Sequence, residues 1–257
     1  MHNVEVQGVS IPALGFGTWK LTGKDCEESV ADALEIGYRH IDTARMYENE
    51  TEVGRGMTAS GVPREDVFLV TKIWPQDFAK DRARKAAEDS LRQLNVDYVD
   101  LLLLHWPSSD TPLAETLGVL AALREEGKIR HAGVSNFPNH LLDESLEIMP
   151  ILTNQIEYHP YTDRAAVVEH CQARDVMITA YTPLARGAVD KDPVIRRIAE
   201  RYGKTPAQVT LRWLIQQDKV STIPKAATPD RRRENLDIGD FTLDDEEMAA
   251  INRPRNA

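Results

Sequence analysis

The sequence predicts an α/β fold in which successive strand–helix units close into a (β/α)8 TIM barrel. Apolar, β-rich segments recur at fairly even intervals along the 257 residues, and amphipathic helical segments fill the gaps between them. Residues 101–104 are consecutive leucines, which is typical of a parallel strand buried on both faces by covering helices. The units follow one another without an evident linker, which favours a closed barrel over an open, doubly wound sheet. We therefore predict a single barrel domain that spans residues 1–257.

The first segment of the chain predicts a short β-hairpin. Residues 4–11 alternate apolar and polar side chains around Gln7 and Gly8. Because this segment precedes the first strand–helix unit, we expect the hairpin to cap the bottom of the barrel, at its N-terminal end. The barrel strands are then expected, in chain order, at residues 13–17, 40–43, 67–72, 99–105, 132–135, 153–158, 177–182 and 221–224.

Capping signals mark the helices between these strands. Asn49 is a candidate N-cap for a helix over residues 49–58, whose first turn is acidic. Asp81 is able to cap a helix over residues 81–94, whose alanines and leucines share one face. Comparable signals are Gly127 after 113–126, Asp192-Pro193 before 194–202 and Thr205-Pro206 before 207–217.

Composition excludes several classes of protein. The net charge of −10 argues against a nucleic-acid partner, because phosphate binding requires a basic face. No apolar run approaches the roughly 20 residues that a membrane helix needs, and the N-terminus lacks the basic start and apolar core of a secretory signal. Only Cys26 and Cys171 are present, far apart, so we expect no disulfide framework and a cytoplasmic protein.

Four side chains of different chemistry fall at or just after the ends of consecutive predicted strands. Asp42 ends the second strand, Lys72 the third and His105 the fourth, and Tyr47 lies on the loop after the second. The active sites of (β/α)8 barrels form at these C-terminal ends, where neighbouring strands lie about 4.8 Å apart. Each residue alone has an ordinary structural explanation, but their coincidence at consecutive strand ends predicts that they converge on one site.

Charge suggests a role for each of the four. Lys72 is costly to bury unless it is paired, and Asp42 is the natural counter-ion. A cation beside Tyr47 is expected to lower the phenol pKa from about 10, which would make Tyr47 a proton donor near neutrality. His105 could orient the oxygen of a substrate by a hydrogen bond. The set offers no acyl nucleophile, so delivery of a proton to a developing alkoxide fits it best.

A metal site is the competing chemistry for these residues. Asp42 and His105 could bind a metal with a nearby carboxylate, as in a barrel hydrolase or isomerase. However, Lys72 between them would repel a cation, and the sequence has no His-x-His pattern. We therefore expect no metal.

Longer motifs carry a resemblance to a known family. Residues 37–44, GYRHIDTA, are followed by Glu50 and then by Val53-Gly54 at the spacing of the N-terminal signature of aldo-keto reductases. Further matches, in the same order as in the family, are LGFGTW at 14–19, LHWP at 104–107, GVSNF at 133–137, NQIEYHP at 154–160 and IPK at 223–225. Over essentially its whole length the chain resembles this family, and in particular its short prokaryotic members such as the 2,5-diketo-D-gluconate reductases.

The resemblance implies an enzyme that reduces aldehydes and ketones, such as small dicarbonyls or keto-sugars, with NADPH and without metal. It implies a catalytic tetrad of Asp42, Tyr47, Lys72 and His105, with Tyr47 as the general acid. A non-catalytic, nucleotide-binding regulatory subunit on the same fold is the alternative. We expect a small-molecule carbonyl as the partner, and a monomer.

The resemblance also assigns residues to the cofactor and the substrate. Tyr181 would stack on the nicotinamide, whose carboxamide Ser135, Asn136 and Gln155 would bind. The substrate pocket would be formed by Trp19, Tyr47, Trp74, His105 and Trp106. The remaining cofactor contacts would be Thr18, Trp19 and Asp42 near the nicotinamide, Thr182 and Leu184 at the pyrophosphate, Lys225, Thr228 and Arg231 at the 2′-phosphate, and Glu234 and Asn235 near adenine.

Two positions depart from the family pattern. Ala226 stands where the family usually has a serine that binds the 2′-phosphate, so the preference for NADPH over NADH is expected to be weaker, with NADH as a second cofactor. Ala185 stands in place of a glycine in the pyrophosphate loop. Arg232 and Arg233, next to Arg231, are expected to be surface residues.

Overall fold

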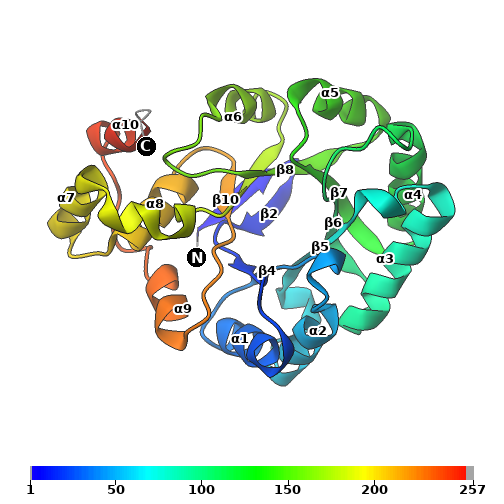
Figure 1. The fold of residues 1–257 in the computed structure, drawn as a ribbon, viewed down its shortest axis with the longest axis horizontal. Helices are drawn as coiled ribbons and strands as arrows, with labels where there is room; N and C mark the ends of the chain where they lie inside the picture. The colour runs from blue at the N-terminus through cyan, green and yellow to red at the C-terminus, as the bar shows by residue number, and fades with distance from the viewer. Residues whose placement is uncertain (1, 253–257) are drawn as a thin grey trace.

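The computed structural model describes residues 2–252, and Figure 1 shows a ring of parallel strands surrounded by helices. Each strand is hydrogen-bonded to the next one along the chain, as expected for successive strand–helix units. The strands of the ring are β3 (Phe16–Gly17), β4 (His40–Asp42), β5 (Phe68–Ile73), β6 (Val99–Leu104), β7 (Ile129–Ser135), β8 (Ile151–Glu157), β9 (Met177–Tyr181) and β10 (Val220–Thr222).

The ring closes between its first and last strands. The amide of Thr222 donates to the carbonyl of Ala13 at 2.8 Å, and the amide of Gly15 donates to the carbonyl of Thr222 at 2.8 Å. Leu14 therefore forms a parallel bridge with Thr222, just before β3. A Cβ atom on Gly17 would lie only 2.6 Å from the carbonyl oxygen of Ile223, so this close approach requires glycine. These contacts confirm the predicted barrel.

Helices cover the outside of the ring, and short 3₁₀ turns occupy several of its loops. No helix within residues 2–252 is both long and apolar enough to cross a membrane. The α-helices are α1 (Gly23–Glu35), α2 (Glu50–Ala59), α3 (Lys80–Leu94), α4 (Leu113–Glu125), α5 (Asn139–Ile148), α6 (Ala165–Gln172), α7 (Pro193–Tyr202), α8 (Pro206–Ile215), α9 (Pro229–Leu236) and α10 (Asp245–Asn252). The 3₁₀ turns are η1 (Arg45–Tyr47), η2 (Arg64–Asp66), η3 (Pro75–Asp77) and η4 (Ala185–Lys191).

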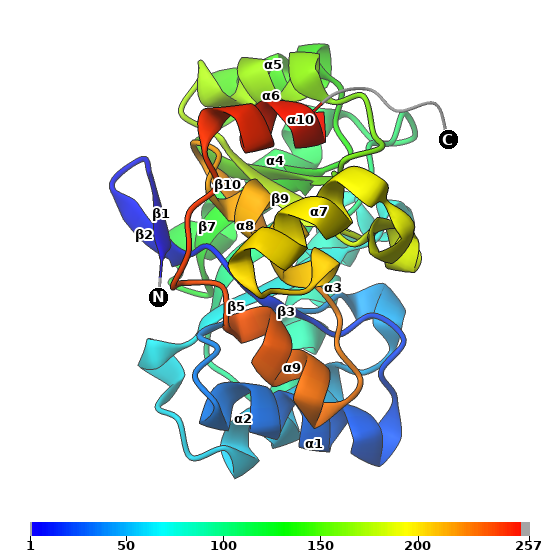
Figure 2. The same ribbon diagram turned by 90° about the vertical axis from the view of Figure 1, so that its left-hand side faces the viewer.

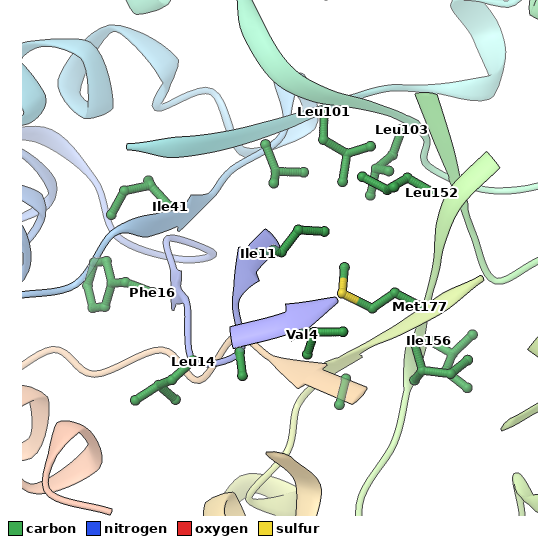
Figure 3. Close-up of a cluster of buried hydrophobic side chains, with 14 of the residues drawn as sticks. Val4, Ile11, Leu14, Phe16, Ile41, Leu101, Leu103, Leu152, Ile156 and Met177 are labelled. Atoms are coloured by element: carbon green, nitrogen blue, oxygen red, sulfur yellow. The ribbon is translucent and has the colours of Figure 1, made fainter. Parts of the chain in front are cut away.

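The predicted hairpin is present at the bottom of the barrel, where it projects from one end in Figure 2. Its strands β1 (Asn3–Val6) and β2 (Val9–Pro12) are antiparallel, and both turn residues have positive φ, as a two-residue turn requires. The side-chain amide of Gln7 donates to the carbonyls of Ile151 and Asp175 at 2.9 Å, at the N-terminal ends of β8 and β9. Figure 3 shows two hairpin side chains, Val4 and Ile11, directed into the apolar cluster of the barrel.

Most capping predictions are confirmed. Gly127 has the expected left-handed backbone, with φ of +74°. Thr205 and Gln208 form a reciprocal capping box at the start of α8, and the Asp192 carboxylate accepts two amides at the start of α7. The prediction for Asp81 is wrong, because α3 begins at Lys80 with Ala79 in the N-cap position.

Asn49 occupies the N-cap position of α2, but its side chain has a different role from the one expected. Its amide oxygen accepts a hydrogen bond from Thr43, and its amide nitrogen donates to the carbonyls of Thr18 and Leu21. The amide is buried, so its polar atoms need hydrogen-bond partners, and they bond to these groups instead of capping α2. Asn49 thus ties the loop after β3 to the loop after β4, both at the mouth of the barrel.

A second glycine fixes the helix that follows this loop. A Cβ atom on Gly54 would lie 2.3 Å from the carbonyl oxygen of Leu94, the last residue of α3. Helix α2 therefore packs against the end of α3 at a distance that only glycine allows. This contact holds in place the segment that leads out of the loop between β4 and α2.

Candidate active site

A cavity of about 480 Å³ opens at the C-terminal ends of the barrel strands. Asp42, the last residue of β4, lines it together with Tyr47 at the end of η1 and His105 directly after β6. Lys72 lies in β5 and is fully buried beneath them. The structure thus brings together all four residues that the strand-end pattern singled out.

The ammonium group of Lys72 is surrounded by oxygen atoms. It lies 2.6 Å from Asp42 Oδ1, 2.7 Å from the carbonyl of Thr43 and 3.4 Å from the hydroxyl of Tyr47. Burial lowers the pKa of Lys72, but the Asp42 carboxylate and then Tyr47 raise it, and the net change is upward. Lys72 is therefore charged at neutral pH, and its ammonium lies next to the Tyr47 hydroxyl.

The pKa of Tyr47 differs from the expectation. Burial is the largest influence and raises the pKa above 10.0, while Lys72 lowers it only in part. The predicted lowering is therefore wrong, because the loss of hydration exceeds the effect of the cation. Tyr47 is therefore a protonated phenol at neutral pH, and its hydroxyl lies 3.4 Å from the Lys72 ammonium.

His105 is held as a neutral imidazole. Burial, and then the charge of Lys72, lower its pKa from 6.5 to about 3. Its ring packs edge to face on Trp74, with ring centroids 5.0 Å apart, and on Tyr47 at 5.9 Å. A neutral histidine so placed can donate one hydrogen bond into the cavity beside the Tyr47 hydroxyl.

Polar side chains from β7, β8 and β9 line the opposite wall of the cavity. The hydroxyl of Tyr181 donates to Asn136 Oδ1 at 2.9 Å, and Asn136 Nδ2 donates to the hydroxyl of Ser135 at 3.0 Å. Gln155 Nε2 donates to Asp42 Oδ2 at 2.8 Å. This wall is therefore connected through Gln155 to the carboxylate that pairs with Lys72.

The predicted aromatic residues divide into two groups. Trp19 and Trp106 line the cavity and are exposed at its mouth, as expected for a substrate pocket. Trp74 does not line the cavity, contrary to the prediction. Its ring packs on the ring of His105 instead. The sequence analysis missed Met46, an exposed side chain at the same mouth, although its place next to Tyr47 was a usable signal.

The predicted pyrophosphate segment has an unusual backbone. Thr182 and Leu184 line the cavity, and Thr182, Ala185 and Arg186 all have positive φ. Arg186 was not predicted but also lines the cavity, as does Glu157 at the end of β8. The cation in a tightly turned segment was the signal in the sequence that could have identified Arg186.

The residues predicted near the adenosine lie in the loop before α9 and along α9 itself. Lys225 lines the cavity, and Thr228 and Arg231 are exposed beyond it. Glu234 accepts a hydrogen bond from the Thr205 hydroxyl at 2.6 Å, and Asn235 is buried. Thr18 is also buried, where its hydroxyl donates to the carbonyl of Asp42 at 3.1 Å.

Arg232 corrects the prediction of a surface residue. Its exposed fraction is only 3%, whereas the side chain of Arg233 is 57% exposed, as expected. The reason is an ion pair with Asp32 of α1, which compensates for burial of the guanidinium. Within residues 2–252, no group of three or more His, Cys, Asp or Glu side chains is arranged to hold a metal ion.

Comparison with known proteins agrees with this geometry. The profile of the aldo/keto reductase family matches residues 13–255. The chain therefore belongs to the aldo/keto reductase family and is an oxidoreductase. It is 46% identical over 248 residues to an aldo-keto reductase of Mycolicibacterium smegmatis, covering 95% of this chain and 90% of the relative.

Two further relatives bear on the substrate. A glyoxal reductase of Bacillus subtilis is 42% identical over 255 residues, covering 98% of this chain and 90% of the relative. A crystal structure provisionally assigned as a 2,5-diketo-D-gluconic acid reductase B superposes with a TM-score of 0.97 at 46% identity, covering 99% of this chain and 91% of the other. Enzymes similar to this chain are thus carbonyl reductases.

Proposed function

We propose that this enzyme reduces aldehydes and ketones to alcohols with NADPH, using Tyr47 as the general acid. The observation that carries this proposal is the position of Lys72, whose ammonium lies between the Asp42 carboxylate and the Tyr47 hydroxyl at the floor of the cavity. A phenol beside a buried cation is suited to give a proton to an oxygen that is gaining negative charge.

The residues of the opposite wall fit a nicotinamide. Ser135, Asn136 and Gln155 offer the hydroxyl and amide groups that suit a carboxamide, and the ring of Tyr181 offers a face for stacking. Lys225 and Arg186 line the same cavity, and cations there suit the phosphates of a dinucleotide. When bound, NADPH supplies the hydride that reaches the carbonyl carbon.

The tetrad residues then have separate tasks. Tyr47 gives its proton to the carbonyl oxygen, and Lys72 stabilises the resulting tyrosinate. Asp42 keeps Lys72 charged, which its buried position would otherwise disfavour. Because its pKa is lowered to about 3, His105 remains a neutral donor that orients the same oxygen.

Small dicarbonyls and keto-sugars are the proposed substrates. The glyoxal reductase and diketogluconic acid reductase relatives support this class, and the open mouth lined by Trp19, Met46 and Trp106 leaves room for a polyhydroxylated chain. The loss of the usual hydroxyl at Ala226 favours some use of NADH as well. We further propose that the enzyme acts in the cytoplasm as a monomer.

The test is a panel of glyoxal, methylglyoxal, keto-sugars and simple aldehydes, assayed by the loss of nicotinamide absorbance with NADPH and NADH side by side. We expect turnover with NADPH, fastest on a member of the dicarbonyl or keto-sugar group. Binding of NADPH without turnover on any carbonyl would instead indicate a regulatory subunit.

A further inference from the structure

The buried Arg232 has no task in the proposed mechanism. It belongs to α9, which lies beside α1 in both ribbon views (Figures 1 and 2). A buried guanidinium is costly unless it is paired and hydrogen-bonded, so a leucine would fill the same space at lower cost. The contacts of Arg232 therefore indicate what the charged group contributes.

The guanidinium connects three segments of the chain. Its Nε donates to Asp32 Oδ2 at 2.5 Å, and its Nη1 donates to the hydroxyl of Ser29 at 3.2 Å, both on α1. The same Nη1 donates to the main-chain carbonyl of Ala226 at 3.1 Å. In addition, the hydroxyl of Tyr38 donates to the carbonyl of Arg232 at 3.0 Å, which fixes the helix backbone at this point.

The Ala226 carbonyl lies within the loop that leads from β10 to α9. The other side of this loop is held by the amide of Gly17, which donates to the carbonyl of Pro224 at 3.2 Å. Lys225 thus stands between two main-chain carbonyls that are each fixed by a hydrogen bond. The backbone on both sides of Lys225 is therefore held by hydrogen bonds.

The cations of this loop are available to a ligand. Among the described residues, neither Lys225 nor Arg231 has an ion-pair partner, and both are exposed. Arg232 differs, because Asp32 neutralises it and Arg233 also approaches Asp32, at 3.6 Å. The buried Arg232 therefore holds the loop in place, while the exposed Lys225 and Arg231 offer positive charge to a ligand.

We propose that Arg232, held by Asp32 and Ser29, is a positioning residue that sets the preference of the enzyme for a 2′-phosphorylated dinucleotide. It fixes the Lys225–Thr228 loop in the form that receives the adenosine 2′-phosphate, where Ala226 offers no hydroxyl of its own. This inference rests on the proposed use of NADPH. It adds a residue that contacts neither the cofactor nor the substrate.

The test compares Arg232→Leu with Arg233→Leu, a matched control that removes the same charge one position along but leaves the Ala226 carbonyl bound. Binding of NADP⁺ and NAD⁺ to the protein is measured by isothermal titration calorimetry. We expect Arg232→Leu to weaken NADP⁺ binding about tenfold, as for loss of a charge-assisted hydrogen bond, and NAD⁺ binding less than about twofold. Arg233→Leu should keep the wild-type ratio of the two affinities.

A second variant guards against a failure of Arg232→Leu to fold. In Arg232→Lys, the single ammonium can keep the ion pair with Asp32, but it cannot also donate to the Ala226 carbonyl as the guanidinium does. We therefore expect this variant, too, to bind NADP⁺ more weakly while its binding of NAD⁺ changes little. A variant at position 232 that folds and keeps the wild-type NADP⁺ to NAD⁺ ratio overturns the inference, as does a wild type that binds both equally. A wild type that binds neither dinucleotide overturns the proposed function itself.

Discussion

The two ends of the candidate site use charge in opposite ways. At the proposed catalytic end, Lys72 and Asp42 are buried, paired with each other and hydrogen-bonded to further groups, so both charges are held in place before any substrate arrives. At the proposed adenosine end, Lys225 and Arg231 are exposed, and neither forms an ion pair within the residues that the structure describes. Fixed charge suits the stabilisation of a transition state, whereas exposed charge suits the capture of a ligand.

Replacing Tyr47 by phenylalanine tests the catalytic end most directly. We expect Tyr47→Phe to lower kcat by about 10²–10⁴-fold, because the proton donor is lost. Binding of NADP⁺, measured by calorimetry, should change little, since the opposite wall is intact. Tyr158→Phe is the matched control, because it removes a phenol hydroxyl that bonds to Gln217, outside the cavity. Equal turnover by Tyr47→Phe and wild type would refute the assignment.

Breaking the buried ion pair should have a large effect on stability. In Asp42→Asn the Lys72 ammonium loses its counter-ion, and an unpaired buried charge typically costs about 3–5 kcal/mol. The free energy of unfolding from urea titration provides the measurement. An unfolding free energy within about 0.5 kcal/mol of the wild type, the range of ordinary surface substitutions, would show that the pair is not needed to hold Lys72.

The neutral state of His105 predicts a dependence of stability on pH. The pKa of His105 is about 3 in the folded protein against an ordinary value of 6.5, so below pH 6.5 the unfolded state binds more protons. Stability should therefore fall as the pH drops from about 6.5, by up to about 1.4 kcal/mol per pH unit from this group. His105→Gln should remove that part of the slope.

The comparison with His105→Gln is needed because other histidines contribute to the same slope. Burial also lowers the pKa values of His40, His131 and His159, and these residues remain in the variant. Unfolding free energies are measured from about pH 7 to pH 5 for both proteins. Parallel curves would mean that His105 has an ordinary pKa in the folded protein.

The catalytic end could be predicted from the sequence, because strand ends are local signals. Apolar runs located the strands to within a few residues, and the barrel rule then placed Asp42, Lys72 and His105 together. The pKa of Tyr47 could not be predicted, since its sign depends on how deeply the loop after β4 is buried. The side-chain hydrogen bonds of Asn49 could not be predicted either, because two of its partners, Thr18 and Leu21, lie on another loop.

The adenosine end shows a larger gap between sequence and structure. The motif after β10 predicts that Lys225 and Arg231 bind the 2′-phosphate, but the arginine run gives no indication that its middle member is buried. The partner of Arg232 is Asp32, 200 residues earlier in the chain. Only the closure of the barrel, which brings α9 beside α1, makes this pair possible.

The smallest expected effect concerns the exposed charge of Lys225. Lys225→Met should leave the unfolding free energy within about 0.5 kcal/mol of the wild type, since no ion pair is broken. It should weaken NADP⁺ binding several-fold and reduce the dependence of that binding on salt, because an exposed cation acts through a screened field. Lys24→Met, on an 83% exposed side chain of α1, is the matched control for loss of a surface charge. If the two variants bind NADP⁺ equally well, the free cation of this loop does not serve the 2′-phosphate, and the contrast between the two ends fails.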